Sequence, residues 1–235
     1  SIFDDVNHGN VEFGVVPVEN SNQGSIKLTL DHLIQEEIKI CGEINLTIKH
    51  CLLSNSKNVS NIKKIYAHEQ TFLQCNEWLT RNIPNAKRIF CTSNSAAAKK
   101  IQNVNSSAAI ASESCSALYK IPILKMNIND IVDNTTRFIV FGNHETDQSG
   151  LDKTSIVVSV NNKAGALKAL LESLSKNKIS MTKIESIPTK INNWEYMFLL
   201  DIVGHANDKN VSIALKEIKK KSTFYKYLGS YPQSV

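Results

Sequence analysis

The chain has 235 residues, of which 42% are hydrophobic, and it carries a formal net charge of +5. This length suits two domains with substantial cores, and no run approaches the roughly 18 to 20 apolar residues that span a bilayer. A nucleic-acid-binding face needs basic residues interleaved with aromatic ones, and aromatic residues are only 7% of the chain. We therefore expect a protein that binds neither membrane nor nucleic acid.

The first 142 residues alternate short apolar runs with amphipathic stretches, which is typical of α/β folds. We expect helices in the gaps between strands, with Ser93 as the N-cap of one of them. The expected strands are 13–18, 38–49, 62–67, 88–92, 108–111 and 137–141, and the clearest helices are 25–35, 69–81 and 93–103.

Residues 143–152 lack apolar periodicity and contain several turn formers, so they are the expected linker. The pattern after the linker predicts strands at 154–160, 179–187, 194–203 and 224–228, and helices at 164–177 and 211–220. That order is β-α-β-β-α-β, the ferredoxin-like unit, which we expect to form a separate domain over 153–235.

The five cysteines form no C-x-x-C pair and the six histidines show no ligand spacing. We expect reduced cysteines, a cytoplasmic protein, and no metal or cofactor. The chain opens at Ser1 directly into a stretch that reads as a helix, so we expect a further segment before it.

Polar residues follow three of the predicted strands. In open α/β sheets, ligands lie beyond the carboxyl ends of strands, where side chains and helix N-terminal N–H groups converge. An ordinary β-α turn explains the first of these segments equally simply, and a structural imidazole explains the histidine of the second. Together they indicate a pocket for an oxygen-rich anion, built from Glu19, Asn20, Ser21 and Gly24, from His68, Gln70 and Gln74, and from Ser93 and Ser95.

The stretch 134–138, Asn-Thr-Thr-Arg-Phe, sets a hydroxyl beside a guanidinium at the start of the last strand before the linker. Arg137 offers a bidentate fork that suits a carboxylate. Thr136 offers a hydrogen bond. Alone, such a pair does not define a site.

Taken in order, these motifs resemble prephenate dehydratase followed by a regulatory ACT domain. The resemblance covers nearly the whole chain and is strongest for the form fused to chorismate mutase, which would place a mutase domain before Ser1. The segments that carry it are 14–21 with Gly24, 42–43 with Leu46, 50–53, 68–70 with 74–75, 93–97 and 134–138, and, in the ACT part, 153–154, 164–167, 181–186, 194–195 and 228–232.

The resemblance implies a two-lobed catalytic region similar to periplasmic binding proteins, with lobes of about 1–51 plus 123–142 and of 52–122. It implies conversion of prephenate to phenylpyruvate by loss of carbon dioxide and water, in a homodimer or tetramer inhibited by L-phenylalanine. Thr136 and Arg137 would be catalytic and the residues at the strand ends would bind substrate. Phenylalanine would bind Ala164, Gly165, Ala166, Leu167, Glu185 and Ser186.

The chain departs from the family pattern at three places. Family members begin with a further strand and a Gly-Pro-x-Gly loop, which lie before Ser1. Ala67 stands where the family has serine, and Ile187 stands where it has arginine. Two other readings stay open: a binding module for an aromatic amino acid or keto acid that catalyses nothing, and a dehydratase that acts on arogenate.

Overall fold

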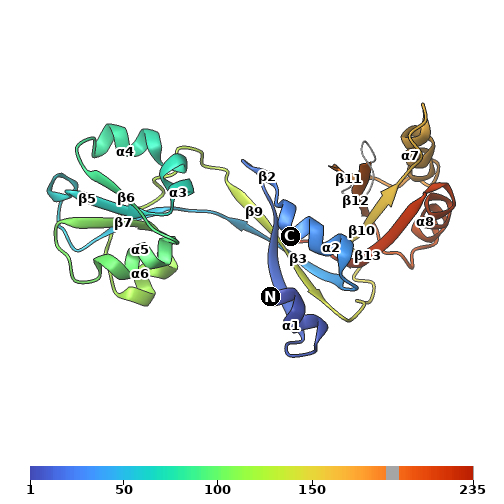
Figure 1. Cartoon of the computed structure of the whole chain (residues 1–235), viewed down its shortest axis with the longest axis horizontal. Helices are drawn as coiled ribbons and strands as arrows, with labels where there is room; N and C mark the ends of the chain where they lie inside the picture. The colour runs from blue at the N-terminus through green and yellow to red at the C-terminus, as the bar shows by residue number, and fades with distance from the viewer. Residues whose placement is uncertain (189–195, 235) are drawn as a thin grey trace. The chain divides into compact units, whose positions relative to one another are not determined.

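The computed structural model describes residues 1–188 and 196–234 and divides the chain into two compact units (Figure 1). One unit comprises 1–46 with 136–235, and the other comprises 47–135. Trp194 and Glu195, which were expected to open a strand, lie outside the described residues. Over the described ranges, no helix is long and apolar enough to cross a membrane.

The first unit contains a lobe built on a four-stranded sheet of order β2-β1-β9-β3. Strands β1 and β9 are antiparallel, and their register places Glu19 opposite Arg137 and Asn20 opposite Thr136. The helices α1 and α2 contribute buried apolar side chains to the core over this sheet. The elements are α1 (Ile2–Asn7), β1 (Phe13–Asn20), β2 (Gly24–Ser25), α2 (Lys27–Gln35), β3 (Lys39–Thr47) and β9 (Thr135–Gly142).

The same unit contains the C-terminal βαββαβ module, whose sheet has the order β11-β12-β10-β13. One face of this sheet packs against α7 and α8 through residues such as Ile156, Leu200, Leu170 and Val211. The expected ferredoxin-like fold is confirmed. Its elements are β10 (Asp152–Ser159), α7 (Ala166–Lys176), β11 (Met181–Pro188), β12 (Tyr196–Val203), α8 (Lys209–Lys221) and β13 (Phe224–Pro232).

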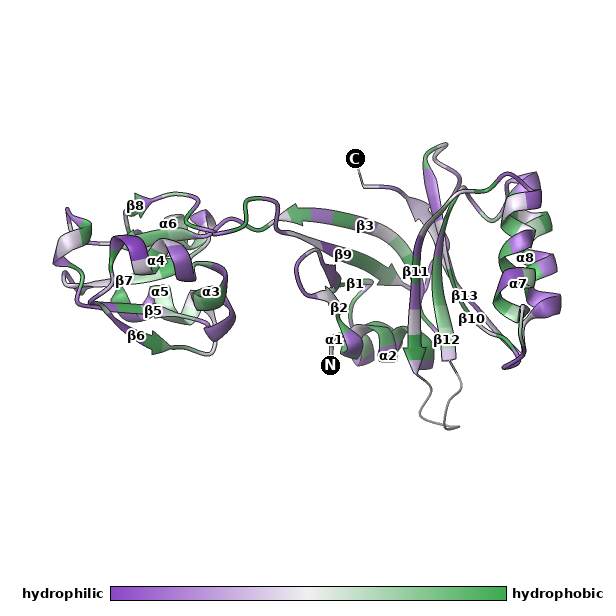
Figure 2. Ribbon diagram, turned by 90° about the horizontal axis from the view of Figure 1, so that it is seen from above, coloured by the Kyte–Doolittle hydropathy of each residue, from purple (hydrophilic) through white to green (hydrophobic). Residues whose placement is uncertain are grey.

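The other face of the ACT sheet shares a hydrophobic core with the first lobe. Val157, Leu199 and Leu228 of the module belong to the same buried cluster as Val16 of β1. Strands β3 and β9 of the lobe are largely hydrophobic in Figure 2. Burial on both faces explains why β10 reads as an almost continuous apolar run instead of an alternating one.

The second unit is a five-stranded sheet of order β6-β5-β7-β4-β8, in which β5 runs parallel to both β6 and β7. Its residues extend beyond the expected 52–122, because Asn129 hydrogen bonds the backbone of Ile48 and His50. The elements are β4 (Cys51–Ser54), the 3-10 helix η1 (Val59–Asn61), β5 (Lys64–Ala67), α3 (Glu69–Gln74), α4 (Asn76–Asn82), β6 (Lys87–Phe90), α5 (Asn94–Ile101), β7 (Ser107–Ala111), α6 (Glu113–Tyr119) and β8 (Ile123–Lys125).

The prediction of one helix over 69–81 is wrong, because the chain forms two helices that meet at Cys75. The carboxylate of Asp130 accepts hydrogen bonds from the backbone N–H groups of Glu77 and Trp78, both at 2.9 Å. These are N–H groups that the first turn of a helix leaves without partners. A distant residue therefore starts the second helix.

Candidate active site

Thr136 and Asn20 form a buried hydrogen-bonded pair across strands β9 and β1. The Asn20 Nδ2 donates to Thr136 Oγ1 at 2.8 Å, and each residue is 8% exposed. The Oδ1 of Asn20 accepts from the backbone N–H of Asn22 at 3.0 Å, which fixes the amide. A hydroxyl that accepts from Asn20 directs its own O–H elsewhere, so Thr136 is set up as an oriented donor.

The turn after β1 gives its other predicted site residues different positions. Gly24 has φ of +77°, a conformation that favours glycine, and it pairs with Asn20 across β2. Ser21 is exposed in the turn, with its Oγ 3.5 Å from Asn22 Oδ1. Glu19 forms an ion pair with Lys183 of the ACT module at 2.8 Å. In this segment, the structure brings only Asn20 to Thr136.

Arg137 follows Thr136 directly, and successive residues of a strand point to opposite faces of the sheet. Its guanidinium bonds to Glu43 at 2.7 Å, Asp201 at 2.6 Å and the Tyr231 hydroxyl at 2.9 Å. The expected fork for a substrate carboxylate is thus engaged by two protein carboxylates. These contacts favour a positioning role for Arg137, on the face of the sheet opposite Thr136.

Electrostatics keep this cluster ionised. Burial would lower the pKa of Arg137, but the charge of Asp201 outweighs burial and raises it above the ordinary value. Burial would raise the pKa of Glu43, but the hydrogen bond from Lys153 and the charge of Arg137 lower it below the ordinary value. The sequence analysis did not include Glu43 or Asp201 as site residues, although Asp201 interrupts the apolar run of β12, and a buried charge in such a run signals a partner.

In the second unit, the parallel strands β5 and β6 bring His68 and Ser93 to the same sheet edge. His68 is the N-cap of α3 and Ser93 is the N-cap of α5. Asn94 connects the two segments, because its Oδ1 accepts from the His68 backbone N–H at 2.9 Å and its Nδ2 donates to Thr71 at 2.8 Å. The expected meeting of these strand ends is present, and Asn94 is a residue that the prediction missed.

The hydrogen bonds at this edge define which atoms can act as donors. The Nδ1 of His68 accepts from the Gln70 backbone N–H at 3.2 Å, so the ring proton lies on Nε2, where it can be donated. The Ser93 hydroxyl accepts from the Ala96 N–H at 3.0 Å. The Ser95 hydroxyl lies 2.8 Å from the Tyr119 hydroxyl. The Gln70 side chain is exposed.

Gln74 is oriented by a buried histidine. The Nε2 of His50 lies 2.7 Å from Gln74 Oε1, and His50 is only 6% exposed. Burial lowers the pKa of His50 below its ordinary value, which favours the neutral ring. A neutral ring that donates from Nε2 to Oε1 leaves the Gln74 amide to present its N–H₂. His50 was noted only as part of a motif, and no property of its neighbours in sequence signals this contact.

Each unit therefore presents uncharged donors: Thr136 and Asn20 in one, and His68, Gln74 and Ser93 in the other. Among residues 1–188 and 196–234, no three His, Cys, Asp or Glu side chains gather as metal ligands would. Such a set of donors suits substrate oxygens that must be oriented without a strong ion pair.

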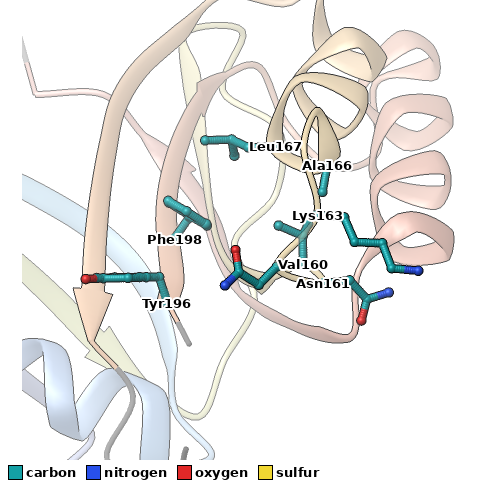
Figure 3. Close-up of a pocket in the computed structure, with 8 residues that line it drawn as sticks. Val160, Asn161, Lys163, Ala166, Leu167, Tyr196 and Phe198 are labelled. Atoms are coloured by element: carbon teal, nitrogen blue, oxygen red, sulfur yellow. The ribbon is translucent and has the colours of Figure 1, made fainter. Parts of the chain in front are cut away.

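A hollow of about 140 Å³ lies in the ACT module beside the N-terminus of α7 (Figure 3). Gly165 is the N-cap of α7, with φ of +82°. The predicted effector residues Ala166 and Leu167 line the hollow, whereas Ser186 reaches it only through its cross-strand neighbour Phe198. The complete lining is Val160, Asn161, Asn162, Lys163, Ala166, Leu167, Tyr196 and Phe198.

The other two predicted effector residues lie apart from this lining. Ala164 is an exposed residue of the loop before Gly165. Glu185 lies on β11, with its carboxylate 3.8 Å from the Lys183 ammonium. The prediction missed Asn161, Asn162 and Lys163, whose types mark a turn and carry no signal for a ligand.

Comparison with known proteins gives two family matches. The prephenate dehydratase model matches residues 1–146, and the ACT domain model matches residues 154–220. A bifunctional chorismate mutase/prephenate dehydratase of Pseudomonas aeruginosa is 42% identical over all 235 residues. The chain spans 64% of the length of that relative.

Two solved structures are similar over nearly the whole chain. Prephenate dehydratase of Arthrobacter aurescens, solved in complex with L-Phe, is 30% identical with a TM-score of 0.86, covering 97% of this chain and 77% of that one. GqqA, described as a novel type of quorum quenching acylase, is 26% identical with a TM-score of 0.85, covering 99% of this chain and 86% of that one. Since one fold carries two described activities, the function must be argued from the residues of the site.

Proposed function

Because the chain belongs to the prephenate dehydratase family and ends in an ACT domain, we propose that it is a hydro-lyase that converts prephenate to phenylpyruvate. The observation that carries this proposal is the Thr136–Asn20 hydrogen bond of 2.8 Å, which orients a hydroxyl on a rigid strand pair. The proposal concerns this chain and not the remaining length of its bifunctional relatives.

The chemistry needs a donor more than a strong acid. The ring carboxylate leaves as carbon dioxide, its electron pair moves through the ring, and the allylic carbon–oxygen bond breaks. The departing oxygen takes one proton and leaves as water, and formation of an aromatic ring drives the step. Thr136 donates a hydrogen bond to that oxygen as negative charge develops on it, which stabilises the transition state.

Neutral side chains suit the rest of the site. A tight ion pair to the ring carboxylate would stabilise the group that must depart, and so would slow the reaction. We assign His68 Nε2, the Gln74 amide and the Ser93 hydroxyl to substrate oxygens. Arg137, which we first expected at the side-chain carboxylate, is assigned instead to positioning Thr136, because its fork is bonded to Glu43 and Asp201.

For regulation, we propose that L-phenylalanine binds at the hollow beside Gly165. Support comes from its apolar lining of Leu167, Tyr196 and Phe198 next to the N-terminal N–H groups of α7, which suit a carboxylate. We further propose a cytoplasmic homodimer or tetramer. The five free cysteines suit a reducing compartment, and the edge strand β11 offers a surface for a second copy.

The test is direct ultraviolet detection of phenylpyruvate formed from prephenate by the full-length protein. Turnover that exceeds the spontaneous rate supports the proposal. Binding of phenylpyruvate without turnover of prephenate would favour the non-catalytic binding module. Competition between prephenate and arogenate in one reaction distinguishes the two dehydratases by their relative kcat/KM.

A further inference from the structure

A row of charges on the first-lobe sheet faces a complementary row on the ACT sheet. The ion pairs measure 2.8 Å from Glu19 to Lys183, 2.6 Å from Arg137 to Asp201 and 2.7 Å from Glu43 to Lys153. The lobe residues lie on the neighbouring strands β1, β9 and β3, and the ACT residues lie on the neighbouring strands β11, β12 and β10. Signs therefore alternate along both sheets. We call these six residues the charge row.

Two members of the charge row adjoin the proposed catalytic pair. Glu19 and Arg137 are cross-strand partners, and the next partners in the same ladder are Asn20 and Thr136. The two pairs point to opposite faces of one sheet, since adjacent residues of a strand alternate. A shift of Glu19 or Arg137 along or across the sheet therefore moves the backbone that holds the Thr136 hydroxyl.

Strand β11 connects the charge row with the hollow of the ACT module. Lys183 and Ile187 alternate with residues of the other face, and Ile187 is buried in the core shared with the first lobe. Ser186, between them, lies opposite Phe198, which lines the hollow. The hollow and the first lobe thus contact opposite faces of the same ACT sheet, and β11 runs through both regions.

Lys183 is held at several points. Its ammonium lies 2.8 Å from Glu19, 3.1 Å from the Ser25 hydroxyl and 3.8 Å from Glu185, and its side chain is 9% exposed. Glu19 and Ser25 are themselves partners in the β1–β2 hairpin that ends in Asn20. One cation of the ACT module therefore fixes the hairpin that orients Thr136.

Resting on the proposed function, we propose that Glu19 and Arg137 are positioning residues for the Asn20–Thr136 pair, and that Lys183 transmits movements of β11 to them. Occupation of the hollow shifts β11, the Lys183–Glu19 contact follows, and the Thr136 hydroxyl leaves its productive position. Inhibition then needs no contact between the effector and the substrate.

The test compares three lysine variants of the full-length protein. Lys183→Met removes the charge and keeps the length of the side chain, and Lys183→Arg restores a cation. Lys226→Met is the matched control, because Lys226 also crosses from the ACT module to the first lobe, where it bonds the Ile34 and Glu36 carbonyls at 2.9 and 2.6 Å, but it contacts neither β1 nor β9.

For Lys183→Met we expect kcat to fall about 10- to 100-fold with KM changed less than about twofold, since small misplacements of a catalytic group have effects of this size. The phenylalanine concentration for half-inhibition should rise about tenfold, which corresponds to a typical allosteric coupling. Lys183→Arg should recover most of both effects, and Lys226→Met should change neither. Equal losses of kcat in Lys183→Met and Lys226→Met would overturn the inference.

A measurement independent of turnover separates this inference from the proposed function. Phenylalanine should change amide hydrogen exchange across β1 and β9 in the wild type and leave it unchanged in Lys183→Met. If the wild type shows this response but forms no phenylpyruvate, only the proposed function fails. If the response is absent from the wild type or equally large in Lys183→Met, the coupling through Lys183 is refuted.

Discussion

Thr136 and Arg137 are neighbours in sequence, yet their side chains lie on opposite faces of one sheet. Thr136 bonds to Asn20, while Arg137 bonds to Glu43 and Asp201. The alternation of a strand separates what the sequence places side by side. One residue is available for chemistry, and the other connects the same strand to the ACT module.

We predict that Thr136→Val lowers kcat for prephenate by roughly 10² to 10⁴-fold, the usual contribution of a positioned proton donor. Thr29→Val is the matched control, because Thr29 is another buried threonine of this lobe, whose hydroxyl donates to the Pro17 carbonyl at 2.7 Å. Steady-state kinetics of both variants provide the measurement. Near-normal kcat in Thr136→Val would refute the assignment.

Replacement of Arg137 by methionine should destabilise the protein by about 3–5 kcal/mol, because it leaves buried carboxylates without their partner. The effect on catalysis should appear in kcat and not in KM. Removing Asp201 as well, in Arg137→Met/Asp201→Asn, should recover part of the stability. Urea unfolding and steady-state kinetics report the two effects. A large rise in KM with unchanged stability would return Arg137 to a substrate carboxylate.

Stability should depend on pH through His50. Its folded pKa is below the ordinary value of 6.5, with burial as the main cause. The unfolded chain therefore binds a proton first as pH falls below about 6.5, so this contribution to stability is complete above that pH and declines below it, toward the folded pKa. The free energy of unfolding, measured from pH 8 to 5, should lose this slope in His50→Asn. An identical slope in both proteins would show that His50 is not its source.

Gly229→Ala should be strongly destabilising. A Cβ at this position would overlap the carbonyl oxygen of Ile40 in β3, and φ of +145° disfavours any other residue. The backbone conformation alone accounts for about 1–3 kcal/mol. Gly150→Ala is the control, since Gly150 also has a positive φ but an added Cβ would have no atom within 4 Å. Thermal unfolding should show a clearly larger loss for Gly229→Ala, and equal losses would contradict the close approach.

Filling the hollow should abolish binding of the effector. We expect millimolar L-phenylalanine to raise the thermal midpoint of the wild type, since a ligand that binds only the native state stabilises it. Ala166→Leu places three more carbons into the hollow of about 140 Å³ and should remove this shift. Calorimetric titration with L-phenylalanine would check the loss directly. A shift of the same size in Ala166→Leu would place the effector elsewhere.

Most of the fold follows from periodicity in the sequence. Strand 13–18 and the βαββαβ order were predictable because apolar alternation and turn formers are local properties. The break at Cys75 was not, because it depends on Asp130, more than fifty residues further along the chain. Long-range contacts of this kind leave no local pattern.

The site divides in the same way. Proximity of Thr136 to Asn20 and of His68 to Ser93 follows from strand ends that meet at one edge or in one ladder. The role of Arg137 could not be read from its motif, because its partners Glu43 and Asp201 come from two other strands. The apolar run of β10 did contain a signal, since burial of both faces predicts that something covers the second face.

The alternating signs of the charge row restrict how the two sheets can be superposed during folding. With the lobe presenting minus, plus, minus and the ACT module presenting plus, minus, plus, a displacement by one strand sets like charges against each other. Buried like charges are strongly unfavourable, whereas the shared apolar core tolerates many alignments. The hydrophobic face brings the modules together, and the ionic pattern selects the single alignment that is kept.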